Sequence, residues 1–471
     1  MAPTLRISHP ALGIELEGQG SAFYPGDAII GRVYRRAPID CAEARIDLAF
    51  HGRAKSRLVV KKGDSRRTYR GRFTLLHQTQ SVFAGPMHIP EGSPSQQEWP
   101  FALEIPRNID AGLFPQQYDA EHSFIPIDPA YVGDQPLPAS FYSGWVSKEG
   151  FIEYYIEATL RFQRKGSWDE VTATMPIHIL AFNPNPPIVD FHLQCVARPG
   201  SVCTQRLVPG MENAELSKTE KMKKFFGAKS VPAFFFRLDV SLPSVIQLGY
   251  DPIPVLMRLI PNWPNTSEII RNVQQKPTLI SFKATLESRC DIRCDGYFRA
   301  READWKEKLE LQSEAHGGRR VTVEIPFSEK GPPVDVGKAL DLRIGGHAGT
   351  SLAFHDFTTF NVSLSHQLSW TAKCEIAGEG WTIHGTQPVK VLPQTSDGRP
   401  GGFAQSQSAK TQRAESWMVP PAEVEPPPTF AEVERDDKKQ SIANAQTVGE
   451  GVGTSSKSGQ EDYSGYPKEK Q

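Results

Sequence analysis

A proline cluster near the end of the chain has the composition of a peptide ligand. Pro426, Pro427 and Pro428 are followed by Thr429 and Phe430. Consecutive prolines pre-form a polyproline II ridge, which aromatic grooves such as those of WW domains bind at little entropic cost. A Pro-Pro-x-Tyr ligand has a tyrosine in place of Phe430, and loss of that hydroxyl's hydrogen bond costs about 0.5 to 1.5 kcal/mol. Pro427, Pro428, Thr429 and Phe430 are a candidate WW ligand, and the alternative is a spacer.

A second candidate site is a stretch of lysines and phenylalanines within residues 212–226. Its basic residues are Lys218, Lys221, Lys223 and Lys224, and its apolar ones are Met222, Phe225 and Phe226. Helical spacing could sort them into a basic face and an apolar face, which favours contact with a membrane surface. The alternative is an inserted helix or loop whose lysines are solvated and whose phenylalanines pack on the protein.

Motifs for catalysis are missing from the sequence, which contains no G-x-S-x-G, no G-x-x-x-x-G-K-[ST], no H-E-x-x-H and no Gly-rich dinucleotide turn. His366, Cys290 and Cys374 have the strand phase of inward-facing residues, which favours a core histidine and buried thiols over a ligand or a nucleophile. His355 and Asp356 have no second pair of ligands at a spacing that fixes a metal geometry. We therefore expect a protein that is not an enzyme and that binds no cofactor and no metal.

The length and the net charge of the chain exclude further classes of function. A chain of 471 residues exceeds one hydrophobic core and favours two domains. A net charge of −1 gives no global attraction to phosphate backbones, so we expect no nucleic-acid partner. No stretch approaches the roughly 20 apolar residues of a membrane span, and the first 20 residues lack a signal core. These features, with six cysteines that match no zinc pattern, predict a cytoplasmic protein with reduced thiols.

The elements that must position any site have the period of β-strands. Ile46, Leu48 and Phe50 alternate with polar residues, and so do the apolar residues of segment 151–162. We expect a half-buried antiparallel sheet, with Glu153 among the residues on its wet face. Pro25-Gly26-Asp27 has turn chemistry and predicts a turn between strands at 19–24 and 28–36.

The second half of the chain repeats this pattern. Segments 236–242 and 280–292 alternate, and residues 360–376 stay in phase throughout, which predicts one strand long enough to serve a whole sheet. Residues 183–187 form a stiff Asn- and Pro-rich break between the two halves. After Pro393 the composition is too polar to bury a core, so we expect a disordered tail over 394–471.

Several short sequence segments, taken together with their order along the chain, resemble the arrestin family, in particular the fungal arrestin-related proteins. In the first half they are residues 23–27 (FYPGD) leading into 30–33 (IGRV), then 46–54, 99–106, 137–141 and 150–154. In the second half they are 241–243, 252–255 and 360–362 through 389–393. The resemblance covers most of residues 5–393, and its weight comes from the order and spacing of the segments.

The resemblance implies an all-β fold of two consecutive immunoglobulin-like sandwich domains, at 5–182 and 188–393. It also implies a trafficking adaptor that binds membrane-protein cargo, a transporter or a receptor, and recruits a HECT-type ubiquitin ligase through WW domains for endocytosis. Such an adaptor would be recruited from the cytoplasm to the plasma membrane or endosomes. Fold alone does not determine function, so two alternatives stay open. One is a structural subunit of a sorting coat, similar to retromer subunits, and the other is a β-sandwich ligand-binding module or enzyme.

Overall fold

The structure is a computed structural model of the chain. It describes residues 4–17, 22–63, 65–92, 96–113, 120–164, 166–181, 183, 185–212, 214, 231–249, 252–296, 299–313, 322–344 and 354–395. Strands dominate these residues, and the expected all-β class is confirmed. Within the same ranges no helix has both the length and the apolar character needed to cross a membrane.

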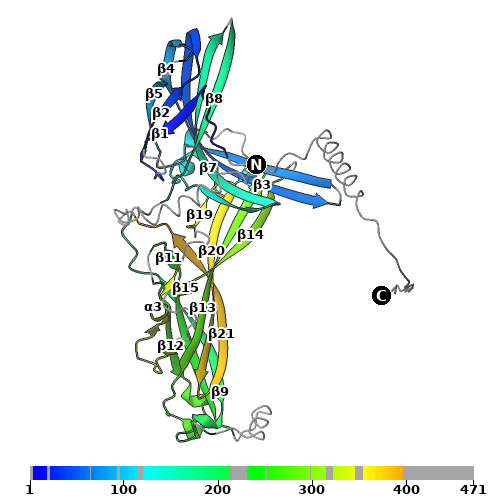
Figure 1. Cartoon of the computed structure of the whole chain (residues 1–471). Coiled ribbons are helices and arrows are strands. Elements are labelled where there is room, and N and C mark those ends of the chain that lie inside the picture. Colours follow the sequence, from blue (N-terminus) through cyan, green and yellow to red (C-terminus); the bar gives the residue numbers. More distant parts are fainter. Residues whose placement is uncertain are drawn as a thin grey trace, which may run out of the picture. The chain divides into compact units, whose positions relative to one another are not determined.

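The first half of the chain forms a β-sandwich of two antiparallel sheets (Figure 1). Its strands are β1 (Gly13–Leu16), β2 (Ala28–Arg35), β3 (Ile39–Lys62), β4 (Ser65–Ile89), β5 (Gln97–Glu104), β6 (Phe141–Trp145), β7 (Lys148–Arg164) and β8 (Ser167–Ile177). One sheet has the order β1-β2-β5, and the other has the order β4-β3-β7-β6 with β8 also paired to β7. The short helices are η1 (Ala111–Leu113), η2 (Ala120–His122) and α1 (Pro129–Gly133).

The second half forms another pair of large sheets. Its strands are β9 (Leu193–Cys203), β10 (Ala233–Pro243), β11 (Val245–Gln247), β12 (Leu256–Pro261), β13 (Thr278–Cys294), β14 (Arg301–Glu310), β15 (Gln312–Ser313), β16 (Val323–Glu324), β17 (Val334–Asp335), β18 (Leu342–Arg343), β19 (Phe357–Thr358), β20 (Val362–Ile376) and β21 (Glu379–Leu392). The main sheet orders are β17-β12-β10-β9 and β11-β21-β20-β13-β14. The helices are η3 (Gln205–Leu207), η4 (Trp263–Asn265), η5 (Glu268–Ile270) and α3 (Val336–Leu340).

Two hydrophobic cores fill these sandwiches, and β20 contributes to both. Its alternation holds along the whole strand, as predicted from segment 360–376. Val362 and Leu364 belong to the first core, whereas Leu368 and Trp370 belong to the second. Strand pairing divides at the predicted break, because strands up to β8 pair only among themselves, but the hydrophobic cores do not divide there. The domain limits at 182 and 188 stay a prediction.

A buried set of contacts joins β3 and β4 to the end of β13. Asn361 Nδ2 donates to Ser56 Oγ at 3.0 Å, and Ser56 in turn donates to the carbonyl of Arg293. Gly71 lies opposite Ser56, where a Cβ atom would be 2.7 Å from the same carbonyl oxygen. The first core thereby continues into residues 290–294 and 360–364 without an intervening solvent layer.

Three expectations need correction. The turn at Pro25-Gly26-Asp27 forms, with Asp27 Oδ2 accepting from Tyr24 N at 2.9 Å. Residues 22–24, the described part of the strand expected at 19–24, form no strand, and Phe23 makes an isolated bridge with Ile179. Glu153 is 7% exposed and does not face water, because residues from β3 and the N-terminal segment cover it. In β13 a bulge between Leu279 and Ser281 shifts the phase, so Leu279 is buried and Ile280 is not.

Candidate docking site on the β3–β4 hairpin

The hairpin of β3 and β4 extends beyond the rest of its sheet. β3 pairs with β7 only as far as Leu58, which lies opposite Lys148, whereas β3 and β4 stay paired to Lys62 and Ser65 (Figure 1). Beyond Leu58 the hairpin is therefore a ribbon of two strands without β7 beside it. Its side chains alternate between the two faces of this ribbon.

The charge of this hairpin is of one sign. Residues 53–72 contain nine Lys and Arg and one acidic residue, Asp64, which is a net charge of +8 in a chain whose total is −1. The rest of the chain therefore carries −9. A surface this basic in an otherwise acidic chain attracts anionic partners and raises their rate of encounter.

Strand register places like charges directly opposite each other on one face. Lys55 lies opposite Arg72, Arg57 opposite Arg70, and Lys61 opposite Arg66. We call these six residues the basic face. Directly opposed like charges destabilise a pair of strands, so this arrangement has a cost in the free energy of folding that an anionic partner would relieve.

Buried carboxylates of β7 hold the inner members of the basic face. Glu153 Oε1 lies 2.5 Å from Lys55 Nζ and 2.5 Å from Arg53 Nε, and Thr4 N donates to Glu153 Oε2 at 2.8 Å. Burial lowers the pKa of Lys55, and the carboxylate of Glu153 partly offsets that effect. Burial alone would raise the pKa of Glu153, but the charges of Lys55 and Arg53 and the hydrogen bond from Thr4 outweigh it, so the pKa is lowered.

Arg57, the next basic residue of β3 toward the tip, makes a bidentate contact with Glu149 of β7. Arg57 Nε and Nη2 donate to the two oxygens of Glu149 at 2.6 and 3.0 Å. Burial opposes ionisation of Glu149, and the contacts that include Arg57 more than compensate, so its pKa is lowered. Planar bidentate pairs are the strongest of the Arg–carboxylate contacts, and this one orients Arg57 at the base of the extended hairpin.

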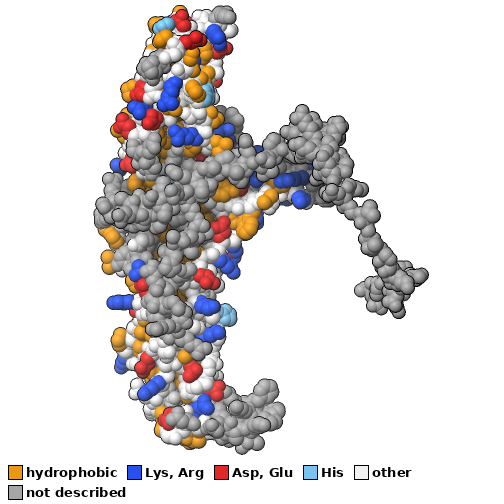
Figure 2. Space-filling model, in the orientation of Figure 1, with side chains coloured by type: hydrophobic (Ala, Val, Ile, Leu, Met, Phe, Trp, Pro, Cys, Tyr) orange, Lys and Arg blue, Asp and Glu red, His pale blue; other side chains and the backbone are white. Residues whose placement is uncertain are grey.

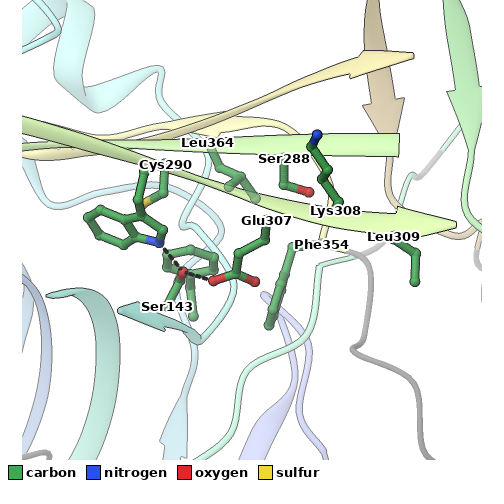
Figure 3. A pocket seen from close by; sticks show the side chains of 10 residues that line it. Ser143, Ser288, Cys290, Glu307, Lys308, Leu309, Phe354 and Leu364 are labelled. Atoms are coloured by element: carbon green, nitrogen blue, oxygen red, sulfur yellow. Dashed lines mark hydrogen bonds between the residues drawn. The ribbon is translucent and has the colours of Figure 1, made fainter. Parts of the chain in front are cut away.

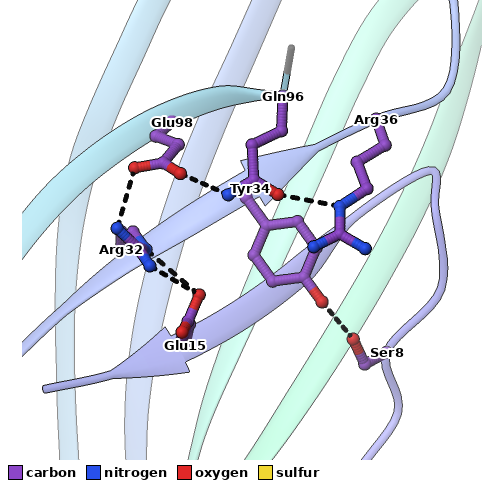
Figure 4. A network of polar contacts seen from close by, with 7 residues as sticks. All are labelled: Ser8, Glu15, Arg32, Tyr34, Arg36, Gln96 and Glu98. Atoms are coloured by element: carbon purple, nitrogen blue, oxygen red, sulfur yellow. Dashed lines mark hydrogen bonds and ion pairs between the residues drawn. The ribbon is translucent and has the colours of Figure 1, made fainter. Parts of the chain in front are cut away.

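The outer members are exposed and keep their charge uncompensated. Across the ranges that the structure describes, no ion pair includes Lys61, Arg66 or Arg70. The sheet of β1, β2 and β5 behaves differently, because its exposed Arg32 contacts Glu15 at 2.9 Å and Glu98 at 3.1 Å (Figure 4). Arg32 thus has two acidic partners, whereas Lys61, Arg66 and Arg70 have none among the described ion pairs.

Protection of an open strand edge would explain some charge at this end of the hairpin. Natural proteins place Lys and other charged residues on edge strands to prevent pairing with other chains. Either sign of charge serves that purpose, and mixed signs would avoid the repulsion between opposed residues. Glu153 and Glu149 compensate Lys55 and Arg57, so the excess of one sign rests on the outer residues Lys61, Arg66 and Arg70, and that excess is more than protection of an edge requires.

A cavity between β6 and β13–β14 is the other candidate site (Figure 3). Trp305 Nε1 donates to Ser143 Oγ at 2.7 Å, and Ser143 Oγ donates to Glu307 Oε1 at 2.6 Å. Its volume is about 40 Å³. A single water occupies at least about 10 to 15 Å³ by this measure, so the cavity has room for two or three waters and not for an organic substrate. We interpret it as a solvated gap in the packing.

The inward-facing residues singled out in the sequence are buried as expected. His366 is 5% exposed and its Nδ1 lies 2.6 Å from Asp356 Oδ1, which also accepts from Val391 N. Burial raises the pKa of Cys374 to about 12 and that of Cys290 well above its usual value, so neither thiol is activated. Within the described ranges, no group of three or more His, Cys, Asp and Glu side chains could hold a metal ion.

Both sites predicted from the sequence fall on residues that the structure does not describe. They are the WW ligand at Pro427, Pro428, Thr429 and Phe430 and the basic segment at Lys218, Lys221, Lys223 and Lys224. The predicted tail also lies outside the described residues, except that Gln394 and Thr395 pair with Asn183.

The basic face was missed in the sequence, although a signal for it exists. Arg53, Lys55 and Arg57 alternate with uncharged residues, and so do Arg70 and Arg72 after the turn. Period-two spacing on both sides of a Gly-Asp turn predicts one charged face of a hairpin. The pairing of particular residues could not be read in this way, because it depends on the register.

No protein-family model matches this chain, and no curated protein sequence matches it.

Proposed function

We propose that this protein is a non-catalytic adaptor that binds an acidic segment of membrane-protein cargo through the basic face of the β3–β4 hairpin. The observation that supports it most is the set of three opposed basic pairs, of which the outer residues Lys61, Arg66 and Arg70 are in no ion pair among the described residues. Glu149 and Glu153 pre-position the inner residues, so a partner finds an ordered surface and loses less conformational entropy on binding.

The fold holds the hairpin in a fixed position, as a recruiting surface requires. Strands β13 and β20 contribute residues to both hydrophobic cores, and the buried contact between Ser56 and Asn361 joins β3 to the start of β20. The cavity lined by Ser143, Trp305 and Glu307 has room only for water, so we assign no chemistry to it.

The sequence resemblance adds the second half of the proposal. The two β-sandwiches are arrestin-like domains, and the chain after Pro393 is the segment that recruits regulatory partners. In this role Pro427, Pro428, Thr429 and Phe430 bind the WW domain of a HECT-type ubiquitin ligase, and the cargo is ubiquitinated and internalised. The protein itself works from the cytoplasm at the plasma membrane or endosomes.

Affinity purification from detergent-solubilised membranes, with three forms of the chain, tests the proposal. They are the full chain, a chain truncated after Thr395, and a face-reversed variant carrying Lys61→Glu, Arg66→Glu and Arg70→Glu. A matched control carries Arg164→Glu, Arg198→Glu and Lys390→Glu, which are exposed residues on other strands with the same change of charge. The full chain and the control should capture the same membrane protein and a ligase.

Each variant should lose one partner. The face-reversed variant should lose the membrane protein and keep the ligase, and the truncated chain should lose the ligase and keep the membrane protein. A direct probe is a fluorescent polyglutamate peptide, whose affinity for the full chain should fall with added salt and be lost in the face-reversed variant. One salt-resistant partner captured equally by all forms would instead identify a structural coat subunit and overturn the proposal.

A further inference from the structure

The turn between β6 and β7 exposes large apolar side chains beside the basic hairpin. Trp145 is 62% exposed and Val146 is 84% exposed. On the neighbouring strand β3, Val60 is 41% exposed. Single exposed apolar residues are common on protein surfaces, but here a tryptophan and a valine are consecutive and both protrude at the tip of one turn.

Backbone contacts hold this turn against the hairpin. Val59 N donates to the carbonyl of Ser147 at 2.6 Å, and Arg57 Nη2 contacts the carbonyl of Val146 at 3.5 Å. The register places Trp145 and Leu58 on either side of Lys148, so all three side chains share one face of the sheet. The apolar residues are therefore ordered neighbours of the hairpin tip.

Basic residues lie at the same tip on both faces of the hairpin: Arg67 shares the face of Val60, and Lys61 and Arg66 share the opposite face. Arg67 lies opposite Val60, and Lys61 and Arg66 form the next cross-strand pair. All three are exposed, and in the part of the chain that the structure describes none of them is in an ion pair. In Figure 2, Lys and Arg side chains and hydrophobic side chains gather together where the hairpin of β3 and β4 extends.

We propose that this tip, formed by Val60, Trp145, Val146, Lys61, Arg66 and Arg67, is a docking surface for an anionic lipid bilayer. Trp145 and the two valines enter the boundary between headgroups and acyl chains, where amphipathic indole rings are enriched. Lys61, Arg66 and Arg67 bind anionic headgroups, and each such residue strengthens binding roughly fivefold.

Neither strand-edge protection nor an acidic protein partner accounts for both halves of the tip. Protection of a strand edge calls for charged residues but not for an exposed tryptophan beside them. An acidic protein partner would contact the basic residues but gains nothing from apolar side chains on a protruding turn, since apolar anchors of protein interfaces fill pockets. A bilayer surface matches both halves, because its anionic headgroups lie directly above its apolar interior.

This surface goes beyond the cargo role proposed above and does not depend on it. Bilayer docking would use the apolar tip, which polyglutamate binding does not need. The two proposals therefore fail separately: loss of vesicle binding leaves the peptide result intact, and loss of peptide binding leaves the apolar contribution to vesicle binding intact.

Flotation of the full chain with vesicles tests the inference. The probes are vesicles of phosphatidylcholine alone and vesicles in which about one third of the lipid is phosphatidylserine, at an ionic strength of about 0.15 M. We expect binding to the anionic vesicles only. Trp145→Ser with Val146→Ser should weaken it about tenfold, and Lys61→Glu with Arg66→Glu and Arg67→Glu should weaken it at least about 100-fold.

The chain offers matched controls for both halves of the tip. Trp168, which is 56% exposed on β8, is changed to serine as the control for Trp145. Arg164→Glu, Arg198→Glu and Lys390→Glu repeat the change of charge elsewhere. Both controls should bind as the full chain does, and Val146→Ser alone, at a turn position, should reproduce part of the apolar effect if the double variant does not fold. No binding to anionic vesicles, or equal binding by the Trp145 and Val146 variants, would overturn the inference.

Discussion

Asn361 and Ser56 meet in the interior, where the amide of Asn361 donates a hydrogen bond of 3.0 Å to the hydroxyl of Ser56. They are 305 residues apart in the chain and both are fully buried. Ser56 lies on β3 and Asn361 directly precedes β20, so this contact joins the strand that carries the hairpin to the strand that the two cores share. The orientation of the hairpin on the body depends on it.

Removing this contact should destabilise the protein. Ser56→Ala leaves the carbonyl of Arg293 and the amide of Asn361 without their partner, which should lower the free energy of unfolding by about 2 kcal/mol. Gly71→Ala should cost at least as much, because its Cβ would lie 2.7 Å from the Arg293 carbonyl oxygen. Urea denaturation measures both, with the exposed Thr79→Ala as the control, and an unchanged midpoint for Ser56→Ala would contradict the role of the contact.

Loss of the carboxylate at Glu153 should be more costly. Glu153→Gln leaves the buried ammonium of Lys55 without its counter-charge, and breaking such a pair costs about 3 kcal/mol. Glu157→Gln, on the same face of the same strand, is the control. Since the pKa of Glu153 is lowered in the folded protein, its contribution is complete above the ordinary value of 4.5 and is lost as the pH falls.

The pH series therefore distinguishes charge from packing at Glu153. The difference in free energy of unfolding between the wild type and Glu153→Gln should shrink when the pH is lowered below about 4.5. A difference that stays constant with pH would show that packing of the side chain, and not its charge, stabilises this position.

His51 should make stability depend on pH in the range just below neutrality. Burial, followed by the neighbouring charges of His77, Arg53 and Arg72, lowers its pKa from 6.5 to about 4. Between these values the unfolded chain binds a proton that the folded chain does not, so the free energy of unfolding falls as the pH is lowered from 6.5 to 4, by about 2 to 3 kcal/mol. Denaturation at several pH values should show a smaller slope for His51→Gln, and the exposed His88→Gln should leave the slope unchanged.

The cysteines should differ widely in reactivity. Cys195 is exposed, whereas Cys290, Cys294 and Cys374 are buried, and burial raises the pKa of Cys294 to about 11. Since the thiolate is the reactive form, iodoacetamide at neutral pH should label Cys195 first, and the buried Cys290, Cys294 and Cys374 only after denaturation. Peptide mass spectrometry reads the labelled sites, and Cys195→Ser should remove the earliest label. Equally fast labelling of Cys290 would contradict the packing around β13.

Much of the fold could be predicted because alternation is a local property. Ile46, Leu48 and Phe50 are fully buried, as their period-two spacing indicates, and the alternation of segment 360–376 continues without a break through β20. A side chain's face follows from the pleat of its own strand. The all-β class and the buried His366 and Cys374 depend on nothing more than this.

Other features depend on which strands pair and in which register, and the local sequence pattern does not determine either. Glu153 has the phase of a wet face, yet Lys55, Arg53 and Thr4 close over it. The bulge after Leu279 moves Ile280 out of phase, because the register with β20 shifts there.

The sequence by itself thus determined the alternation of single strands, such as residues 46–50 and 360–376, and the positive charge of residues 53–72. The opposed pairs of the basic face, the exposure of Trp145 beside it and the use of β20 in both cores were decided by tertiary structure alone. The physical reason is that alternation follows from the geometry of a single strand, whereas register and burial follow from contacts between residues up to 305 positions apart.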